Sequence, residues 1–369
     1  MTKSTRTSPH DSQPSGTEPP KNSAAAQAPN EEVGNLNVSV LILFFNRAES
    51  LKQVFEAVHQ ARPARLFLYQ DGPRNEQDLP GINACREVVG KVDWPCDVHR
   101  NFQTRNFGCD PSGFMAQSWA FSLTDKCIVL EDDVVPSPSF FTFCQQMLDK
   151  YEHDERIGMI AGFNTDEQTT DVGEDSYFFT TNFSIWGWAS WARVVNNWDE
   201  NYTWLENPHA VAKIEALTKE RRLRTDFLPM AKAHKAAGKP YFETIFHAFL
   251  LLHGQMSILP CTNMVSNIGV TDNSTHFAGT IRTLPLAYRK IFTMKRHDMA
   301  FPLHEPTEIV DHVAYRKRTY RVMGWRCPWR KAARSLEELL LNLRYGQFSR
   351  IAAAVKNRLH IIFFGRKFH

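Results

Sequence analysis

Apolar runs of strand length alternate with helix-spaced segments through residues 38–130 of this 369-residue chain. Residues 38–45 have the unbroken apolar character of a strand buried on both faces, and helical spacing follows over residues 48–60. Further strands begin about thirty residues apart, which is the length that a helical crossover between parallel strands requires. The alternation therefore predicts an α/β fold with an open, mostly parallel, Rossmann-like sheet flanked by helices. The remaining elements expected in this part are strands at 65–69, 97–100 and 126–130 and helices at 82–89 and 112–123.

The pattern changes beyond residue 131, where helices become more frequent and aromatic residues gather between 177 and 191. The elements expected here are a strand at 157–161 and helices at 139–151, near 210–237 and at 244–253.

Composition divides the chain into three regions. Residues 1–36 are rich in Ser, Thr, Pro, Gln and Asn, and they hold too few apolar side chains to offset the entropy lost on ordering, so we expect disorder. Residues 37–285 contain the α/β pattern. Residues 286–369 are expected to form a basic, partly amphipathic helical extension.

The basic excess lies near the C-terminus. Residues 316–369 hold 14 Lys and Arg against two Glu, a net charge of +12, whereas the rest of the chain sums to −9. This distribution argues against a general nucleic-acid binder and favours a local anionic partner. Three interpretations stay open: helices on an anionic membrane surface, helices packed on the body, or a protein partner. Two apolar stripes at helical spacing support amphipathic helices, and a capping-box signature at Ser335 and Glu338 marks the start of the first. The first stripe is Leu336, Leu339, Leu340 and Leu343, and the second is Phe348, Ile351, Ala352, Val355 and Leu359.

Export and membrane spanning are not expected. The first 37 residues lack the apolar stretch of a signal peptide, and no window reaches the length of a spanning helix. The seven cysteines are odd in number and form no C-x-x-C pair, so we interpret them as reduced thiols. The expected compartment is the cytoplasm, with peripheral attachment at the inner face of the cytoplasmic membrane as an extension of that interpretation.

Three consecutive carboxylates, Glu131, Asp132 and Asp133, directly follow an apolar strand. Burying like charges side by side is costly unless a cation neutralises them. A hard divalent ion such as Mg²⁺ or Mn²⁺, held by carboxylates and ligand phosphates, is the usual solution, and a solvated turn is the alternative. Arg47 and Asp71 follow the first and second strands, so the same sheet edge should hold all five side chains.

The order of these segments resembles bacterial GT-A-fold glycosyltransferases related to family 2 and, more distantly, eukaryotic N-acetylglucosaminyltransferase I. The resemblance covers roughly residues 38–276. It implies a GT-A domain that moves a sugar from a nucleotide-diphosphate donor, with a UDP-sugar expected, to a carbohydrate or lipid-linked acceptor. Metal dependence and inversion are implied with it. A role in surface polysaccharide or glycolipid synthesis is expected mainly because a basic amphipathic C-terminal region suits a lipid-linked acceptor. The segments that carry the resemblance are VLILFFNRAESLKQVFEA, LFLYQDGPR, VDWPC, RNFGC, IVLEDDVVPSPSFFTFC, DERIGMIAGFN, WGWASWARVV and NMVSNIGVTDNSTH.

The resemblance assigns roles at the acidic motif. It implies that Asp133 ligates Mn²⁺ or Mg²⁺ bridging the diphosphate, with Glu131 and Asp132 near the sugar and ribose. Arg47 and Asp71 match positions that hold the nucleotide. A further residue, His276, stands where many GT-A enzymes bring a late histidine to the metal, although a structural role is the alternative.

An inverting transfer also needs a base for the acceptor hydroxyl, and Glu243 is the candidate. Relatives usually carry Trp-Asp where this chain has Phe242 and Glu243, so the carboxylate is one methylene longer. A carboxylate that only interacts with a helix dipole is the alternative, and Asp166 and Asp199 are reserve candidates for the base.

Aromatic residues supply a second candidate contact. Trp186, Gly187 and Trp188 combine flat rings with a close backbone, which suits a sugar ring, and core packing is the alternative.

Two other functions stay open. A sugar-phosphate nucleotidyltransferase would need a Gly-rich phosphate loop directly after the first strand, and residues 44–47 contain no glycine. A non-catalytic nucleotide-sugar binder or scaffold of the same fold stays open because Glu243 replaces the usual Asp.

Overall fold

The computed structural model describes residues 36–220, 227–270, 281–324 and 328–364. The predicted disordered segment lies outside these ranges except for Leu36. The strands are β1 Leu36–Phe44, β2 Pro63–Gln70, β3 Asp97–Phe102, β4 Lys126–Glu131, β5 Val134–Pro136, β6 Ile157–Ala161, β7 Tyr177–Thr180, β8 Trp188–Trp191, β9 Met256–Pro260 and β10 Val265–Asn267. The α-helices are α1 Ala48–Ala61, α2 Leu79–Val89, α3 Cys109–Phe121, α4 Pro138–Lys150, α5 Ala192–Val195, α6 Pro208–Glu220, α7 Phe227–Ala237, α8 Phe242–His253, α9 Leu286–Thr293, α10 Val313–Met323, α11 Pro328–Arg344 and α12 Phe348–Phe364.

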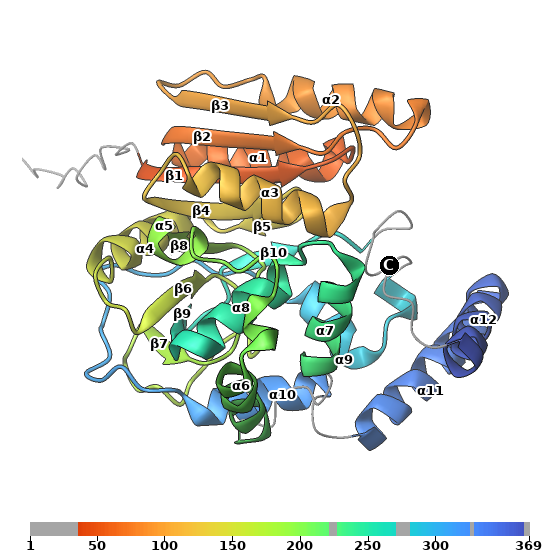
Figure 1. Cartoon of the computed structure of the whole chain (residues 1–369). Coiled ribbons are helices and arrows are strands. Elements are labelled where there is room, and N and C mark those ends of the chain that lie inside the picture. Colours follow the sequence, from red (N-terminus) through yellow and green to blue (C-terminus); the bar gives the residue numbers. More distant parts are fainter. Residues whose placement is uncertain (1–35, 221–226, 271–280, 325–327, 365–369) are drawn as a thin grey trace, which may run out of the picture. The chain divides into compact units, whose positions relative to one another are not determined.

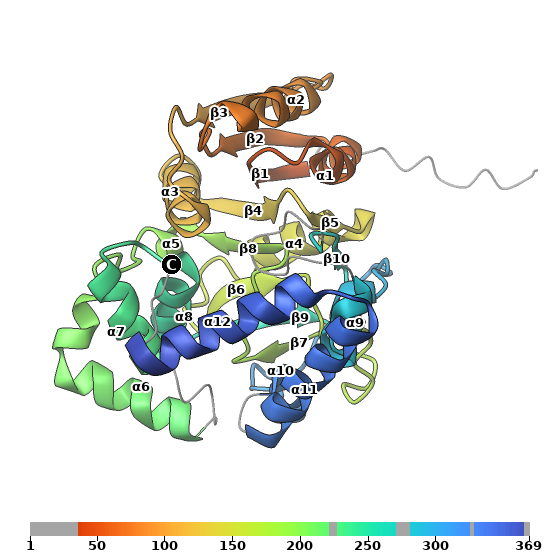
Figure 2. The ribbon, with the colours of Figure 1, turned by 90° about the vertical axis from the view of Figure 1, so that its right-hand side faces the viewer.

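An eight-stranded sheet in the order β3-β2-β1-β4-β8-β6-β9-β7 forms the centre of the fold (Figure 1). The first four strands in that order run parallel, as the thirty-residue alternation predicts. Figures 1 and 2 show α1 and α3 on opposite faces of this half, which explains why β1 and β4 are apolar without alternation. The predicted fold class, a mostly parallel α/β sheet flanked by helices with a helical C-terminal region, is confirmed.

The second half of the sheet departs from the parallel pattern. Strand β8 pairs antiparallel with both β4 and β6, and the edge strand β7 pairs antiparallel with β9. A separate two-stranded ribbon joins β5 to β10, with Asn267 opposite Val134. This ribbon brings residues from 265 onward next to the acidic motif that precedes β5.

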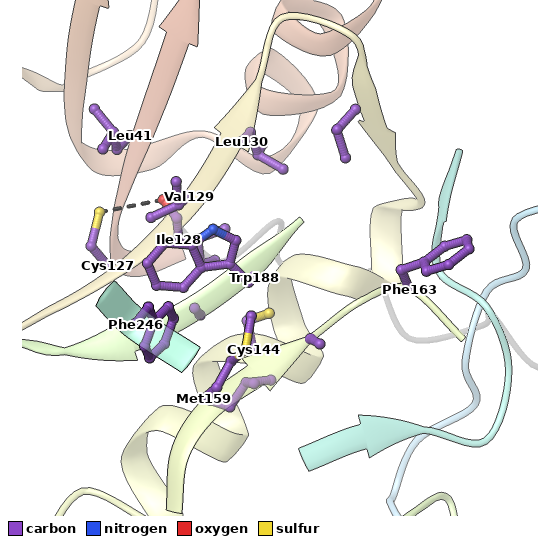
Figure 3. Packing of buried hydrophobic residues seen from close by; sticks show 14 of the residues in the cluster. Leu41, Cys127, Ile128, Val129, Leu130, Cys144, Met159, Phe163, Trp188 and Phe246 are labelled. Atoms are coloured by element: carbon purple, nitrogen blue, oxygen red, sulfur yellow. Dashed lines mark hydrogen bonds between the residues drawn. The ribbon is translucent and has the colours of Figure 1, made fainter. Parts of the chain in front are cut away.

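Trp188 of β8 packs against Phe246 of α8 in the core. Figure 3 shows Trp188 among Ile128, Val129 and Phe246, and its side chain is 1% exposed. Its ring centroid lies 6.3 Å from Phe121 and 5.2 Å from Phe246. Because large aromatic rings bury so much apolar surface, this cluster holds the central strands to the helices that cover them.

Residues 286–324 pack on the sheet domain. Ile291 of α9 and Tyr315 of α10 are buried, and the main-chain N–H of Ser176 donates to the carbonyl of His304 at 2.8 Å. The region predicted as an extension from residue 286 onward therefore begins inside the packed fold.

The last two helices expose apolar side chains. The helix start predicted at Ser335 is wrong, because α11 begins at Pro328, and proline is well suited to a first helical position. The guanidinium of Arg334 lies 4.4 Å from the ring centre of Tyr288 and donates to the carbonyls of Val322 and Met323, so α11 contacts α9 and α10 through a polar face. Among the described helices, none is both long and apolar enough to cross a membrane.

Candidate active site

Arg47 and the acidic motif meet at the carboxyl edge of the sheet. Nη2 of Arg47 lies 2.8 Å from Oδ2 of Asp133 and also pairs with Asp132, while Nε lies 3.4 Å from Oδ2 of Asp132. The main-chain N–H of Phe45 donates to the same Asp132 oxygen at 3.5 Å. This arrangement arises because β1 and β4 are adjacent and parallel, so both strands end at the same edge. The structure thus brings together three residues that the sequence predicted as site residues.

Negative charge exceeds positive charge at this edge. Burial raises the pKa of Asp132 to about 6, because lost hydration and the charge of Asp133 outweigh the lowering effect of Arg47. Burial also raises the pKa of Glu131 well above its usual range, and the charges of Asp133, Glu243 and Asp132 add to that effect. A single guanidinium among these carboxylates leaves the edge suited to a further cation.

The donor set fits a hard divalent ion. Within the ranges that the structure describes, no group of three or more His, Cys, Asp or Glu side chains is arranged to hold a metal. Mg²⁺ in nucleotide sites is nevertheless usually bound by one or two carboxylates with phosphate oxygens and waters, and Glu131 and Asp133 supply such oxygens. His276, the other predicted ligand, lies outside the described residues.

Asn267 and Gly269 are site residues that the sequence analysis missed. Nδ2 of Asn267 lies 3.5 Å from Oδ1 of Asp133, and its Oδ1 accepts the N–H of Gly269 at 2.8 Å. A Cβ on Gly269 would lie 2.1 Å from Oδ2 of Asp133, so only glycine lets this segment close on the carboxylate. The signal was the Asn-x-Gly spacing in the segment NMVSNIGV, which ends at Val270.

Asp71 anchors the loop that follows β3. Its carboxylate accepts the N–H groups of Gly72 and Phe107 at 2.9 Å and of Gly108 at 3.0 Å, and it accepts Nδ2 of Asn106 at 2.8 Å. Four donors fill the four lone-pair positions of a carboxylate. The predicted contact between Asp71 and a nucleotide stays a prediction, and the contacts in the structure give this residue a positioning role.

Glu243 lies in the first turn of α8. Its negative charge contributes to the raised pKa values of both Glu131 and the Cys109 thiol. The close approach of α3 and α8 depends on Gly113, because a Cβ there would lie 2.7 Å from Cδ1 of Phe242. This packing fixes the start of α8, so the charge of the predicted base can act on Glu131, which lies more than one hundred positions earlier in the chain.

Glu243 also lines a cavity of about 310 Å³. Most of the wall is aromatic or aliphatic, and Trp186 contributes to it, with its ring centroid 4.8 Å from that of Phe163. Side chains from β7, α7, α9 and α10 or their flanking loops complete the wall. Glu243 is thus the cavity residue whose charge also acts on the acidic motif.

The other two aromatic-segment candidates do not line this cavity. Trp188 belongs to the core described above, because β8 is an interior strand covered on both faces. Gly187 has a φ of +61°, and a Cβ there would lie 2.8 Å from Cγ1 of Val265, so glycine is needed for packing against β10. Of the three residues, only Trp186 is placed to contact a ligand in the cavity.

The reserve candidates for the base have structural partners. Oδ2 of Asp166 accepts Nε of Arg318 at 2.8 Å. Asp199 accepts Oγ1 of Thr203 at 2.9 Å and the N–H of Trp204 at 3.1 Å. Neither residue lines the cavity.

Neither a protein-family model nor a curated protein matches this sequence. Similar solved structures include a UDP-glucose pyrophosphorylase complexed with UDP-glucose, at 8% identity over 44% of this chain and 81% of that chain, with a TM-score of 0.27. They also include the inositol-1-phosphate CTP transferase from T. maritima, at 12% identity over 44% and 74%, with a TM-score of 0.26. A third is 4-diphosphocytidyl-2C-methyl-D-erythritolsynthase from Anaerococcus prevotii DSM 20548, at 9% identity over 48% and 78%, with a TM-score of 0.29. Likeness at this level carries no argument about function, and the resemblance to glycosyltransferase family 2 stays a prediction.

Proposed function

We propose that this chain is a metal-dependent, inverting glycosyltransferase with a nucleotide-diphosphate sugar donor at the carboxyl edge and an acceptor in the cavity. The donor class is a UDP-sugar, and the acceptor is a carbohydrate or lipid-linked alcohol. The observation that carries the proposal is the position of Glu243, which lines the cavity and whose charge reaches the acidic motif strongly enough to help raise the pKa of Glu131. A base for the acceptor belongs at the boundary between the two substrates.

The acidic edge supports binding of the donor. Glu131 and Asp133 would hold Mn²⁺ or Mg²⁺, which neutralises the charge that develops on a departing diphosphate. Arg47 supplies a fixed guanidinium for a phosphate oxygen, and its pairs with Asp132 and Asp133 hold it at the edge. Asp71 keeps the neighbouring loop in shape through Phe107 and Gly108.

Glu243 supports the proton transfer. In the reaction, the bond between the anomeric carbon and the phosphate oxygen breaks, and a bond from the acceptor oxygen to that carbon forms. The proton of the acceptor hydroxyl moves to the Glu243 carboxylate, and the nucleoside diphosphate leaves from the opposite face. The extra methylene of Glu relative to Asp lengthens the reach of the base into the cavity.

The test compares Glu243→Gln with Glu49→Gln, a matched control because Glu49 is an exposed carboxylate in the first turn of α1. Release of nucleoside diphosphate is measured with a panel of nucleotide sugars, Mn²⁺ and acceptors. We expect Glu243→Gln to lower the transfer rate about 100- to 10,000-fold with donor binding intact, and Glu49→Gln to leave both unchanged.

Three outcomes would contradict the proposal. Equal turnover by both variants would remove Glu243 from the base role. Donor binding without turnover across the acceptor panel would favour a non-catalytic binder. Formation of nucleoside triphosphate from the nucleotide sugar and pyrophosphate would indicate nucleotidyl transfer instead.

We also propose that α11 and α12 dock on an anionic membrane surface, which would place the reaction at the inner face of the cytoplasmic membrane during surface polysaccharide or glycolipid synthesis. Trp329, Leu336, Leu340 and Leu343 are exposed on one side of α11, with Trp329 83% exposed. The net charge of +12 over residues 316–369 complements anionic lipid. An exposed apolar stripe within a basic region is the arrangement expected of a helix at a membrane interface.

Flotation with vesicles tests this docking. The wild type should bind phosphatidylglycerol vesicles and not phosphatidylcholine vesicles, and the double variant Leu336→Ser/Leu340→Ser should bind about tenfold or more weakly. Leu123→Ser is the matched control, because Leu123 is an exposed leucine at the end of α3. Unchanged flotation of the double variant would rule out this surface.

A further inference from the structure

The wall of the cavity contains a polar side chain that the fold leaves without a partner. Asn182 lines the cavity and is 6% exposed, and neither its Oδ1 nor its Nδ2 has a hydrogen-bond partner among the described residues. Its main chain is bonded normally: the N–H donates to Oγ1 of Thr180 at 3.2 Å, and the carbonyl accepts Oγ of Ser257 at 2.9 Å. A buried carboxamide without a partner destabilises the fold, so its presence in a cavity points to a ligand.

Other polar groups of the same wall are paired within the protein. Oγ1 of Thr165 lies 2.6 Å from Oγ1 of Thr319, and the Tyr315 hydroxyl accepts the N–H of Thr165 at 3.1 Å. Oγ1 of Thr244 lies 3.0 Å from Nδ1 of His234. Unlike these hydroxyl groups, both polar atoms of the Asn182 side chain lack a hydrogen-bond partner among the described residues.

The rest of the cavity is suited to an apolar group. Its volume of about 310 Å³ is roughly twice the ~150 Å³ of an apolar cavity that holds benzene, so it has room for on the order of ten carbon atoms. The wall includes Phe163, Phe183, Ile185, Trp186 and Leu259. A purely polar glycan would leave these side chains and its own hydroxyl groups without suitable partners.

We infer that the cavity binds an amphipathic acceptor alcohol with three parts. An alkyl, acyl or aryl body of about ten carbon atoms fills the cavity, and an amide or hydroxyl group next to that body pairs with Asn182. The reacting hydroxyl lies towards Glu243 at the margin with the acidic edge. This inference rests on the proposed glycosyl transfer and narrows its acceptor class to molecules that carry an apolar group.

The first experiment tests the apolar body by measuring how affinity depends on alkyl chain length. Calorimetry is done with methyl, butyl and octyl β-D-glucopyranoside, below the micelle concentration and without donor. The affinity of the wild type should rise about a hundredfold or more from methyl to octyl, because each buried methylene contributes to binding. Ser184→Phe places a ring in the cavity and should abolish the dependence on chain length. A flat response in the wild type would overturn the inference.

The second experiment tests Asn182 with octanamide and 1-chlorooctane, which have the same chain length and differ in hydrogen bonding. The wild type should prefer octanamide about tenfold, and Asn182→Leu should lose that preference. Asn182→Leu should also raise the Tm by about 2 °C, because leucine removes an unpaired polar group, and this rise shows that the variant folds. Asn201→Leu, at an exposed asparagine, is the control and should retain the preference.

Failure of this inference differs from failure of the proposed function. Donor turnover in a wild type that shows no chain-length dependence in binding would exclude the apolar acceptor and leave the transferase intact. Chain-length-dependent binding without transfer from any donor would leave the cavity assignment standing and exclude the transferase. A fall in the Tm of Asn182→Leu would show that the carboxamide is structural and would overturn its assignment to the ligand.

Discussion

The carboxyl edge of the sheet and the wall of the cavity are linked by the charge of Glu243, but they are built in opposite ways. The edge consists of short polar motifs that directly follow β1, β2 and β4, so each motif is recognisable beside an apolar run. The wall collects single side chains from segments between residues 163 and 323. Charge chemistry at a strand end is thus a local property of the sequence, whereas the shape of a cavity is a property of packing.

The largest effect should come from two tryptophans, Trp188 in the core and Trp186 in the cavity wall. Trp188→Ala should lower the free energy of unfolding by about 4 kcal/mol, because it empties a core site, and Trp186→Ala should lower it by about 1–2 kcal/mol, because Trp186 is only partly buried and borders the cavity. Urea unfolding measures both values. Equal losses would mean that Trp186 is as much a core residue as Trp188.

A second prediction concerns the loop anchor at the edge. Asp71→Asn replaces one acceptor oxygen with an NH₂ group that faces N–H donors, which should cost about 2 kcal/mol of stability. Hydrogen exchange at the amides of Phe107 and Gly108 should accelerate in the variant, while exchange in α8 stays unchanged. Acceleration throughout the protein would indicate a global defect and contradict a local anchor.

A third prediction uses the titration of the acidic edge. Burial raises the pKa of Asp132 to about 6 and that of Glu131 well above its usual range, and protons compete with a metal for these carboxylates, so the affinity for Mn²⁺ should fall as the pH is lowered from 7 to 5. Calorimetry with Mn²⁺ and UDP at pH 5, 6 and 7 measures the slope. Asp132→Asn should flatten it, and an equally steep slope in that variant would exclude Asp132 as a titrating group.

The smallest effect concerns Asp78, which braces the loop after β1 by accepting Nδ2 of Asn46 at 2.9 Å and pairing with Arg74. The hydrogen bond from the Arg74 side chain is the main cause that lowers the pKa of Asp78 to about 2. Because this pKa is depressed, ionised Asp78 stabilises the folded protein fully above the unfolded pKa near 4. That contribution to the free energy of unfolding is lost as the pH falls towards 2.

The variant Asp78→Asn should therefore lose about 1 kcal/mol relative to the wild type at pH 7 and at pH 5, and a smaller amount at pH 3. Urea unfolding at the three pH values gives the difference. A stability difference between Asp78→Asn and the wild type that grows as the pH falls would be opposite to this prediction and would exclude the pair of Asp78 with Arg74 as its cause.

The contrast between edge and wall explains what sequence reasoning could reach. The grouping of Arg47 with Asp132 and Asp133 was predictable, because parallel neighbouring strands must end together. The role of Asn267 was not, since it depends on the antiparallel ribbon of β5 and β10. Trp188 was ambiguous because an aromatic segment has the same appearance whether its strand is interior or at a cavity.

The C-terminal helices illustrate a related limit. The apolar stripe of α11 was visible in the sequence, but a stripe does not reveal whether it packs inward. The contacts of Arg334 with Tyr288, Val322 and Met323 orient the helix, and they leave Leu336 exposed. Helix boundaries near a proline were similarly uncertain, because a capping pattern and a Pro start compete for the same segment.

Gly113 of α3 lies against the ring of Phe242, the residue directly before the proposed base Glu243, and leaves no room for a Cβ. A side chain at position 113 would force the Phe242 ring to shift at the start of α8, next to Glu243. For the proposed transferase we therefore expect a substitution at Gly113 to alter acceptor selectivity through Phe242 and Glu243. Gly113→Ala should change the ranking of acceptors by kcat/KM and leave donor affinity unaltered, because the substitution displaces the residue that precedes the proposed base.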